Sequence, residues 1–404
     1  MTDIDVVILA GGKGTRLKDG LAKPMHKVAG LTMLEHIVSA SRQIDPKQVI
    51  IVQADGMDYS AYGDSVVTQK EANGSAAALQ TALPKVTSEK ILVLNADMPL
   101  ITGELLNEVV EHDQALVVAE LQNPFGYGRV VVEKNKVASI VEEKDATQAQ
   151  KKIKAINSGI YLFDTKKVTE DLKNISNDNA QGEYYLTDAA NGLDVVIAEN
   201  IEEIYGVNDH SQLAIANKIM RNRINQIHMK NGVGMIDPQT TYIDVNVSIE
   251  AGTVIEPNTV IQGPSTIGAF NTIGPNAHLR SLTKTENNVH IGNFVETKNA
   301  QIGAHTQIGH LSYIGDAVIG KSVNIGAGTI FVNYDGKNKH ISTIGNHAFI
   351  GSNTKIVSPV TIEDEAITAA GSVITNDVKK HQLGIARARQ ENKDDFWDRM
   401  DHQE

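Results

Sequence analysis

The sequence predicts an α/β domain with a parallel sheet in the first half of the chain and a parallel β-helix in the second half. Three observations support this fold class. In the first half, continuous aliphatic runs alternate with helical stretches. From Ile249 to roughly Thr375, an aliphatic residue returns at every sixth position, and Gly follows most of these residues directly. With 404 residues, the chain is long enough for two or three domains.

The six-residue repeat fits neither a helix, which repeats at about 3.6 residues, nor an ordinary strand, which repeats at about 2. It is typical of a short strand and a turn, and three such sides make a coil of about 18 residues. Chance and a β-sandwich are the alternatives, but sandwich strands would alternate. Gly after the aliphatic residue is expected to permit turn dihedrals that residues with a Cβ resist. The longest unbroken series is Ile249, Ile255, Ile261, Ile267 and Ile273.

The repeat is interrupted between Ile325 and Ile344. We interpret the interval between these two residues as close to one coil. It contains Gly326–Lys339, which carries polar, aromatic and basic side chains. Insertions in a solenoid go to loops on one face, which is often the binding face. We therefore expect this loop to form part of an active site.

A Gly-rich loop follows the first predicted strand. The run Val6–Ala10 is continuously aliphatic, as expected of a strand buried on both faces. The loop Gly11–Arg16 comes directly after it. Glycines after a buried strand let the backbone approach a phosphate, and Lys13, Arg16 and Lys23 add positive charge. The loop alone is a weak signal, because it lacks the spacing of the dinucleotide fingerprint and of the Walker A loop.

Further strands are predicted over 48–52 and 90–94, separated by helical stretches, which favours a parallel sheet with crossover helices. The later strand ends in Asn95-Ala96-Asp97. A carboxylate just past the carboxyl end of a buried strand lies where α/β sheets bind ligands. The commoner role of a lone Asp is a helix cap or a turn residue. Beside a phosphate-type loop, however, Asp97 is also a candidate magnesium ligand.

Composition and charge restrict the classes of function. Acidic residues outnumber basic ones, 49 against 37, and the formal net charge is −12, which argues against nucleic acid or an anionic membrane as a partner. Cysteine is absent, which excludes disulfides, thiolate metal sites and a cysteine nucleophile. We expect no signal peptide and no membrane span, because neither pattern occurs. A cytoplasmic location follows as an expectation.

The predicted domains are 1–210 for the α/β domain and 232–404 for the β-helix with a charged and polar C-terminal tail. A helical stretch from Leu213 to about Lys230 carries several basic residues and is followed by Asn231-Gly232, a typical helix stop. We interpret 211–231 as a linker helix between the two domains.

Seven motifs, spread over both halves, carry a resemblance to a known family. They are Leu9–Arg16 (LAGGKGTR), Gly126–Arg129 (GYGR), Asn179–Asp188 (NAQGEYYLTD), Gly292–Glu296 (GNFVE), Gly309–Asp316 (GHLSYIGD), Asn324–Thr329 (NIGAGT) and Asn333–Gly336 (NYDG). With these motifs, nearly the whole chain resembles the bacterial bifunctional N-acetylglucosamine-1-phosphate uridyltransferase/glucosamine-1-phosphate N-acetyltransferases. Because both sets of motifs occur together and in order, the resemblance is specific.

The resemblance implies a Rossmann-like nucleotidyltransferase domain followed by a left-handed parallel β-helix of hexapeptide repeats that forms a homotrimer. It also implies two reactions. The second domain transfers acetyl from acetyl-CoA to the amine of glucosamine 1-phosphate. The first domain then couples N-acetylglucosamine 1-phosphate to UTP with Mg²⁺ as cofactor, and it releases pyrophosphate and UDP-N-acetylglucosamine. Cationic groups stabilise the charge that develops in such a phosphoryl transfer.

For uridyl transfer, the resemblance implies that Lys23 and Asp97 are catalytic and that Asp97 and Asn208 hold the magnesium ion. An Asn side chain supplies a neutral oxygen that a hard cation accepts. Within the set below, Gly128, Glu142 and Asn157 match the sugar pocket. The residues implied to bind UTP or the UDP-sugar are Leu9, Ala10, Gly11, Gly12, Lys23, Gln69, Gly74, Ser75, Gly128, Glu142, Asn157 and Asn208.

For acetyl transfer, the resemblance implies that His310 is the general base, since an imidazole suits deprotonation of the sugar ammonium. A solvated turn residue is the ordinary alternative for any one of the 13 histidines, but His310 directly follows a repeat Gly. The residues implied to bind the sugar phosphate substrate are Arg280, Lys298, Tyr313, Asn324, Asn333, Tyr334 and Lys339. Those implied to bind acetyl-CoA are Ala327, Ser352, Ala370 and Arg387.

Two other functions stay open at this point. One is a sugar-1-phosphate nucleotidyltransferase of another specificity, with a β-helix that is only structural or regulatory. His310 and Asn324 count against it, because a structural prism does not need them. The other is a trimeric scaffold with degenerate sites, against which the retention of Lys23 and Asp97 counts.

The chain also departs from the family pattern. The family usually has Tyr-Gly-Asp where this chain has Asn95-Ala96-Asp97, and Ser75 stands where Thr is usual. These changes keep the catalytic carboxylate and the hydroxyl. They therefore bear on substrate preference and rate more than on the class of reaction.

Overall fold

The computed structural model describes residues 2–12, 17–71 and 73–400 and divides into two compact units. Unit 1 comprises residues 1–220 and unit 2 comprises residues 221–404. The division falls inside helix α5 (His210–Lys230), which coincides with the segment interpreted as a linker helix. The part of the Gly-rich loop over 13–16, including Lys13 and Arg16, lies outside the described residues. No described helix is both long and apolar enough to cross a membrane.

Unit 1 is built on one twisted sheet with the strand order β5-β4-β1-β6-β10-β7-β11-β9-β8. Strands β5, β4, β1 and β6 pair in parallel, whereas β10 runs antiparallel to both β6 and β7. The strand bounds are β1 Ile4–Ala10, β4 Gln48–Ala54, β5 Ser65–Gln69, β6 Lys90–Asn95, β7 Ala115–Glu120, β8 Arg129–Glu133, β9 Lys136–Val141, β10 Ala155–Asp164 and β11 Asp194–Ile197. A small antiparallel pair joins β2 (Lys27–Val28) and β3 (Leu31–Thr32).

Helices cover both faces of this sheet, which explains the continuous aliphatic strands. Alternate residues of β1 enter opposite cores: Val6 and Ile8 pack with one cluster, and Val7 packs with the other. The first cluster takes apolar residues from α1 (Met33–Arg42) and α3 (Gly103–Val110), and the second from α2 (Ser75–Ala82) and α4 (Thr165–Asp171). A parallel sheet buried on both faces needs apolar side chains at every strand position.

Short 3₁₀ helices connect these elements. In unit 1 they are η1 Lys23–Met25, η2 Leu83–Lys85, η3 Gln150–Lys152, η4 Leu186–Ala190 and η5 Ile201–Ile204, and the C-terminal tail contains η6 Trp397–Arg399.

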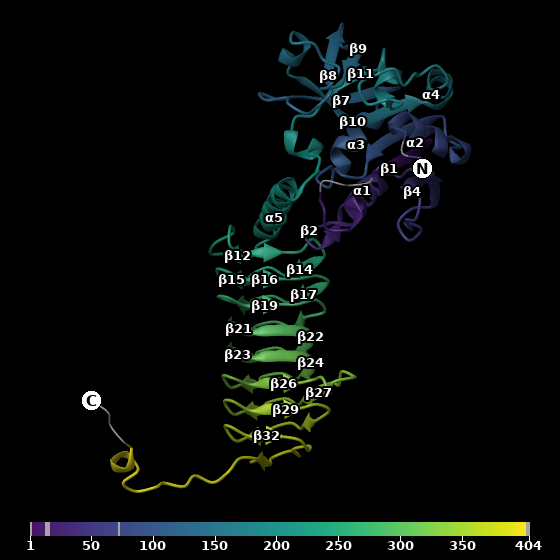
Figure 1. Ribbon diagram of the computed structural model, residues 1–404. Coiled ribbons are helices and arrows are strands. Elements are labelled where there is room, and N and C mark those ends of the chain that lie inside the picture. The colour runs from purple at the N-terminus through teal and green to yellow at the C-terminus, as the bar shows by residue number, and fades with distance from the viewer. Residues whose placement is uncertain (1, 13–16, 72, 401–404) are drawn as a thin grey trace. The chain divides into compact units, whose positions relative to one another are not determined.

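Unit 2 is a three-sided prism in which parallel strands of successive coils stack on one another (Figure 1). We name its sides face A, face B and face C in chain order. Face A consists of β12 Gly234–Met235, β15 Val254–Ile255, β18 Thr272–Ile273, β21 His290–Asn293, β23 Gln307–His310, β25 Asn324–Ile325, β28 Phe349–Ile350, β31 Ile367–Thr368 and β33 Leu383–Gly384. Face B consists of β13 Tyr242–Ile243, β16 Val260–Ile261, β19 His278–Leu279, β22 Glu296–Ile302, β24 Tyr313–Ile319, β26 Ile330–Val332, β29 Lys355–Val357 and β32 Val373–Ile374.

Face C consists of β14 Val247–Ile249, β17 Ser265–Ile267, β20 Lys284–Thr285, β27 Ser342–Ile344 and β30 Thr361–Ile362. The second halves of β22 and β24 complete it, because Lys284 pairs with Gln301 and Val318 with Thr343. We call the turn from face A to face B edge AB, and the turn from face B to face C edge BC.

The register of the prism confirms the predicted coil. Ile255 pairs with Ile273 and Ile273 with Ile291, so that each step spans three sides of the six-residue repeat. The side chains of Ile255 and Ile273 are fully buried. Each contributes about 1.5–3 kcal/mol by burial, so the column of isoleucines inside each face supplies the core of unit 2.

The reason predicted for the repeat glycines holds at Gly274, which follows Ile273 and has φ +105°, but not at most of the others. After Gly292, for example, the residue with positive φ is Phe294, further along the turn. A Cβ on Gly292 would lie 2.0 Å from the Gly309 carbonyl oxygen of the next coil, and one on Gly351 would lie 2.5 Å from that of Thr368. Close stacking of coils therefore selects glycine at Gly292 and Gly351.

The interval between Ile325 and Ile344, which contains the loop, was also wrongly interpreted as close to one coil. A coil of the usual length would pair Ile325 on face A with Thr343, but Ile325 pairs with Ile350, and Ile344 lies on face C and pairs with Ile319. This coil is therefore longer than its neighbours. The extra residues leave the prism at edge BC, between β26 and β27, as a hairpin with a bridge between Tyr334 and Lys339. The spacing in the sequence gives only the number of residues, and it does not distinguish residues of a loop from residues of a prism face.

We predict that Ile308→Ala lowers the free energy of unfolding by about 2–5 kcal/mol, because its fully buried side chain would leave a cavity. The neighbouring Gln307 is exposed, and Gln307→Ala should change that free energy by less than about 0.5 kcal/mol. Urea unfolding of both variants, followed by circular dichroism, measures the difference. Equal effects of the two substitutions would contradict a packed prism interior.

Candidate functional sites

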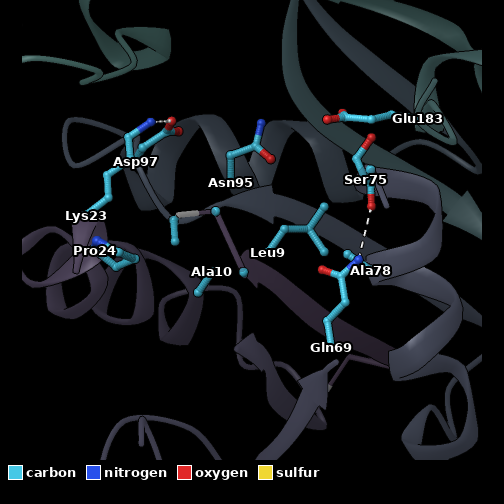
Figure 2. Close-up of a pocket in the computed structure, with 14 residues that line it drawn as sticks. Leu9, Ala10, Lys23, Pro24, Gln69, Ser75, Ala78, Asn95, Asp97 and Glu183 are labelled. Carbon is cyan, nitrogen blue, oxygen red and sulfur yellow. Dashed lines mark hydrogen bonds and ion pairs between the residues drawn. The ribbon is translucent and has the colours of Figure 1, made fainter. Parts of the chain in front are cut away.

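A cavity of about 540 Å³ opens at the carboxyl ends of β1 and β6 in unit 1 (Figure 2). Ligands bind to open α/β sheets at this end of the strands. Most of the residues implied to bind the nucleotide line this cavity: Leu9, Ala10, Gly11, Gly12, Lys23, Gln69, Gly74, Ser75 and Asp97. Pro24, Ala78, Asn95, Ala96 and Glu183 complete the lining.

At one end of the cavity, Lys23 joins the two implied metal ligands. Its Nζ donates a hydrogen bond to Asp97 Oδ2 and another, of 2.8 Å, to Asn208 Oδ1. The Lys23 and Asp97 side chains are only 14% and 25% exposed. Three segments meet here: the start of η1, the turn after β6 and the residues before α5. Charge-assisted hydrogen bonds of this kind fix all three side chains at the cavity wall.

The same residues fit a divalent cation. A carboxylate and an amide oxygen already converge on one cationic atom, and both are hard oxygen ligands. In the part of the chain that the structure describes, no group of three or more His, Asp or Glu side chains could hold a metal ion. A cation at Asp97 and Asn208 would therefore take its other ligands from substrate phosphates and water, as Mg²⁺ commonly does.

At the other end of the cavity, the start of α2 is joined to the segment around Tyr184. Gly74 has φ +105°, and a Cβ on it would lie 2.4 Å from the Tyr184 carbonyl oxygen, so that only Gly fits. Ser75 Oγ accepts a hydrogen bond of 3.0 Å from the Leu186 N–H. Gln69 donates to the Gly74 carbonyl at 3.4 Å. These contacts give the wall a fixed shape.

The three residues implied to form the sugar pocket lie together but do not line this cavity. The Asn157 N–H donates to the Gly128 carbonyl at 2.9 Å, and a Cβ on Gly128 would lie 3.1 Å from Glu142 Oε1. Glu142 instead lines a separate cavity of about 210 Å³ together with Asp145 and Asp188. Burial raises the pKa of the Glu142 carboxyl, and the charges of Asp145 and Asp188 raise it further.

In unit 2, three cations gather beside edge BC. Arg280 and Lys298 occupy equivalent positions in successive coils, since the Arg280 N–H donates to the carbonyl of Thr297. Lys339 reaches the same place from the extruded loop. Contact with Lys339 lowers the pKa of the Lys298 ammonium, and the charge of Arg280 lowers it further. Arg280 also forms an ion pair of 3.0 Å with Glu296, so that one of the three positive charges is already compensated.

Neighbouring side chains shape the surroundings of these cations. Tyr313 lies over Gly315, where a Cβ would come within 2.5 Å of the Tyr313 hydroxyl oxygen. Asp316 accepts hydrogen bonds from Asn299 at 2.6 Å and from Asn333 at 2.5 Å, which fixes the base of the loop to the preceding coils. Asn333 is buried, and its side-chain amide is hydrogen-bonded to Asp316. The Tyr334 hydroxyl donates to the Gly336 carbonyl within the loop.

A second group of predicted residues forms a line along edge AB. His310, Ala327, Ser352 and Ala370 stand at corresponding positions in four successive coils. The main-chain bonds show this register: the Asn353 N–H donates to the Ala327 carbonyl and the Gly371 N–H to the Ser352 carbonyl. His310 is exposed at the first of these positions. A Cβ on Gly371 would lie 3.8 Å from Arg387 Cδ, so that Arg387 continues the line.

Asn324 does not lie with Tyr313 on face B. It is an exposed residue of β25 on face A, two coils beyond His290 in the same column of outward side chains. Burial lowers the pKa of the His290 imidazole, and the charge of His310 lowers it further. The predicted set therefore divides between the two faces that meet at edge AB.

Sequence reasoning gave no role to some residues that line the unit 1 cavity. Asn95 ends β6, and a Cβ on Gly159 would collide with its amide nitrogen at 2.2 Å. In the sequence, Asn95 stands out only as a departure from the family pattern. Glu183 lies inside the Asn179–Asp188 motif, which serves there only as a mark of resemblance. The sequence signal for Asn95 was its position directly after the predicted strand 90–94, and the signal for Glu183 was its position within the motif.

Comparisons with known proteins agree with this architecture. Residues 6–161 match the family model of the MobA-like NTP transferase domain, and residues 341–376 match that of the bacterial transferase hexapeptide. The bifunctional protein GlmU of Oenococcus oeni is 57% identical over 410 residues, covering 100% of this chain and 96% of the relative. The proteins of the same name from Streptococcus suis and Limosilactobacillus fermentum are each 42% identical, over 98% and 97% of this chain and 98% of each relative.

These matches and the parallel pairing of the strands confirm the predicted fold class, an α/β nucleotidyltransferase domain followed by a left-handed parallel β-helix of hexapeptide repeats. Identity of this extent, over the full length of both chains, also confirms the resemblance that the motifs indicated. The chain belongs to the GlmU family of bifunctional enzymes, with uridyltransferase and acetyltransferase activity.

Proposed function

We propose that the unit 1 cavity carries out uridyl transfer from UTP to N-acetylglucosamine 1-phosphate and that the unit 2 prism first acetylates glucosamine 1-phosphate with acetyl-CoA. One observation carries this assignment. The two sets of implied residues converge at separate places, one at the carboxyl ends of β1 and β6 and one along edges AB and BC. A single-function protein would need only one of them.

In the uridyl reaction, the sugar phosphate oxygen attacks the α-phosphorus of UTP, and the bond to pyrophosphate breaks. Lys23 is placed to turn from Asp97 and Asn208 toward the phosphates and to balance their charge. Asp97 and Asn208 would hold a divalent cation, which we assign as Mg²⁺, and this cation would further stabilise the phosphoryl charge. The wall formed by Gln69 and Gly74 holds the nucleoside in place, which orients the α-phosphorus for attack.

The sugar would meet Gly128, Glu142 and Asn157 rather than the nucleoside wall. Since the raised pKa of Glu142 reflects burial beside two other carboxylates, this group is suited to a neutral hydroxyl or amide partner more than to a phosphate. The phosphate end of the sugar then points toward Lys23.

We predict that Asp97→Asn abolishes uridyl transfer while acetyl transfer stays within about twofold of wild type. The substitution removes the one charged group among the two metal ligands, in a unit that forms its own core. Separate assays of the two half-reactions measure this. Asp113→Asn, at a fully exposed side chain, serves as the matched control, and a parallel fall of both activities would contradict separate sites.

In the acetyl reaction, the phosphate of glucosamine 1-phosphate binds to Arg280, Lys298 and Lys339. His310 accepts a proton from the sugar ammonium, and the free amine attacks the thioester carbonyl. The C–S bond then breaks while the nitrogen loses a second proton to the sulfur, so that CoA leaves as the thiol. His310 lies at edge AB of the coil that carries Tyr313 on face B. Strand β24 follows His310 closely and pairs with β22, which carries Lys298. Paired strands therefore join the general base to the phosphate site, which suits catalysis by orientation.

Acetyl-CoA is proposed to lie along edge AB. Small residues at Ala327, Ser352 and Ala370 leave this edge open in successive coils, and Arg387 provides a cation at its far end for the phosphates of CoA. Coils are spaced by about 4.8 Å. An extended pantetheine arm would thus reach from Arg387 along the edge to His310, where the thioester is needed.

We predict that His310→Ala lowers acetyl transfer by a factor of about 10²–10⁴, as expected for loss of a general base. Uridyl transfer should stay unchanged, because His310 belongs to the other unit. His305→Asn is the matched control: His305 is an exposed prism residue with φ +63°, a conformation that Asn tolerates. Acetylation by His310→Ala at near the wild-type rate, at saturating acetyl-CoA, would end the assignment.

A homotrimer is part of the proposal. Phe349, Ile367 and Leu383 form a ladder of outward apolar side chains on face A, each 44–54% exposed and paired to the next through the backbone. Phe294 and Leu311, on successive coils at edge AB, are about equally exposed, at 59% and 60%. Contiguous exposed apolar side chains of this kind are typical of contact surfaces. A site shared between subunits would also explain why Asn324 faces away from Tyr313.

Since UTP and acetyl-CoA are intracellular metabolites, we place the enzyme in the cytoplasm.

We predict that the full chain sediments at three times the mass of one chain and that Ile367→Asp dissociates it, because a charge cannot be buried unpaired in a subunit contact. Acetyl transfer should fall with the trimer, and uridyl transfer should persist. Analytical ultracentrifugation with both assays tests this. A monomeric variant that acetylates at the wild-type rate would contradict a shared site.

A further inference from the structure

The Asn179–Asp188 motif places a carboxylate over the unit 1 cavity. Glu183 lines this cavity, and its side chain extends from the Ser75 end toward Asn95 (Figure 2). The carboxylate forms no hydrogen bond or ion pair with any residue that the structure describes, whereas its main chain is fully engaged. A half-buried carboxylate without such a partner is costly unless a ligand or water provides donors.

The Glu183 main chain is held from both sides by Asn179. The Asn179 Nδ2 donates to the Glu183 carbonyl at 2.7 Å, and the Glu183 N–H donates to Asn179 Oδ1 at 3.3 Å. The next residue is joined to the nucleoside wall, since the Tyr184 N–H donates to the Asn73 carbonyl at 2.8 Å and the Ala76 N–H donates to the Tyr184 carbonyl at 3.0 Å. Glu183 is therefore presented by a rigid segment next to Gly74 and Ser75.

The chemistry of a carboxylate limits what this group can bind. An ionised Glu only accepts hydrogen bonds, and it repels phosphate. The cationic end of the cavity, where phosphates belong, is marked by Lys23 and Asp97, and Figure 2 shows Glu183 at the opposite end. The natural donors that remain in a nucleotide and a sugar are hydroxyl groups. Two neighbouring hydroxyls can donate to the two oxygens of one carboxylate.

We propose that Glu183 is a specificity-determining residue of uridyl transfer that accepts hydrogen bonds from vicinal hydroxyl groups of a substrate, with Asn179 as its positioning residue. The hydroxyls come either from the ribose of UTP or from the hexose of the sugar 1-phosphate. This inference rests on the proposed function, because it takes the unit 1 cavity as the uridyl-transfer site.

The test measures KM for UTP and for N-acetylglucosamine 1-phosphate, and the dissociation constant of UTP by calorimetry, in the full-length Glu183→Ala variant. The KM of the hydroxyl-bearing substrate should rise by about 10- to 100-fold, as expected for loss of hydrogen bonds to a charged group. Glu183→Gln keeps the shape and one acceptor oxygen, so its effect should be smaller. Glu133→Ala, at an exposed residue of β8, is the matched control and should behave as wild type.

Deoxy substrates distinguish the two sources. If Glu183 binds the ribose, wild-type enzyme should prefer UTP to 2′-deoxy-UTP, and Glu183→Ala should lose this preference. If it binds the hexose, the KM of the sugar 1-phosphate should rise while the affinity for UTP stays unchanged. Unchanged KM values for both substrates in Glu183→Ala, or a fall in kcat alone, would overturn the proposal.

The role of Asn179 gives a second, independent readout. Asn179→Ala should raise the same KM less than Glu183→Ala does, and the double variant should resemble Glu183→Ala alone, because Asn179 acts through Glu183. Additive effects would show a merely structural role and count against positioning. Normal uridyl transfer by Asp97→Asn would instead refute the proposed function itself. A kcat for uridyl transfer near the wild-type value at saturating substrates shows that unit 1 of each variant is folded.

Discussion

Parallel strand pairing is the constraint on which both units depend. In unit 1 it brings the carboxyl ends of β1 and β6 to one edge, so that Leu9 and Asn95 become neighbours in the sheet although far apart in sequence. In unit 2 it stacks coil on coil, so that His310, Ala327 and Ser352 form a line. Main-chain hydrogen bonds of the same kind thus place the cavity residues of unit 1 and align the edge residues of unit 2. Side-chain hydrogen bonds between distant segments, such as those of Lys23 with Asp97 and Asn208, then fix the functional groups within this frame.

The charges of the side chains then determine which chemical groups each site can bind. Lys298 lies beside Lys339 and Arg280, and its side-chain contact with Lys339 and the two neighbouring positive charges lower its pKa. The opposite occurs around Glu142, where burial and neighbouring acids raise the pKa of the carboxyl. In the proposed assignment, phosphate groups therefore bind near Lys23 in unit 1 and near Lys298 in unit 2, whereas hydroxyl groups bind near the carboxyl of Glu142.

Much of the architecture could be predicted because local patterns report periodicity. The six-residue repeat predicted the three-sided coil that the pairing of Ile255 with Ile273 shows. The close contact between coils at Gly292 could not be predicted, since the carbonyl oxygen that excludes a Cβ there belongs to the next coil. Likewise, the length of the extruded loop could not be read from spacing, because the same interval can be one coil or two sides and a loop. Glu183 was missed because only the folded motif turns it toward a cavity.

The sequence by itself determined the two domains, the repeat, the family and the residue types available for phosphate, metal and proton transfer. Motifs are local, and a family's motifs keep their order along the chain. The tertiary structure alone decided which of those residues meet: that Lys23 lies between Asp97 and Asn208, that Lys339 joins Lys298 from a loop, and that Asn324 faces another side than Tyr313. The reason is physical, because strand register and coil stacking set distances between segments, and no pattern along a single chain encodes which atoms of separate segments come into contact.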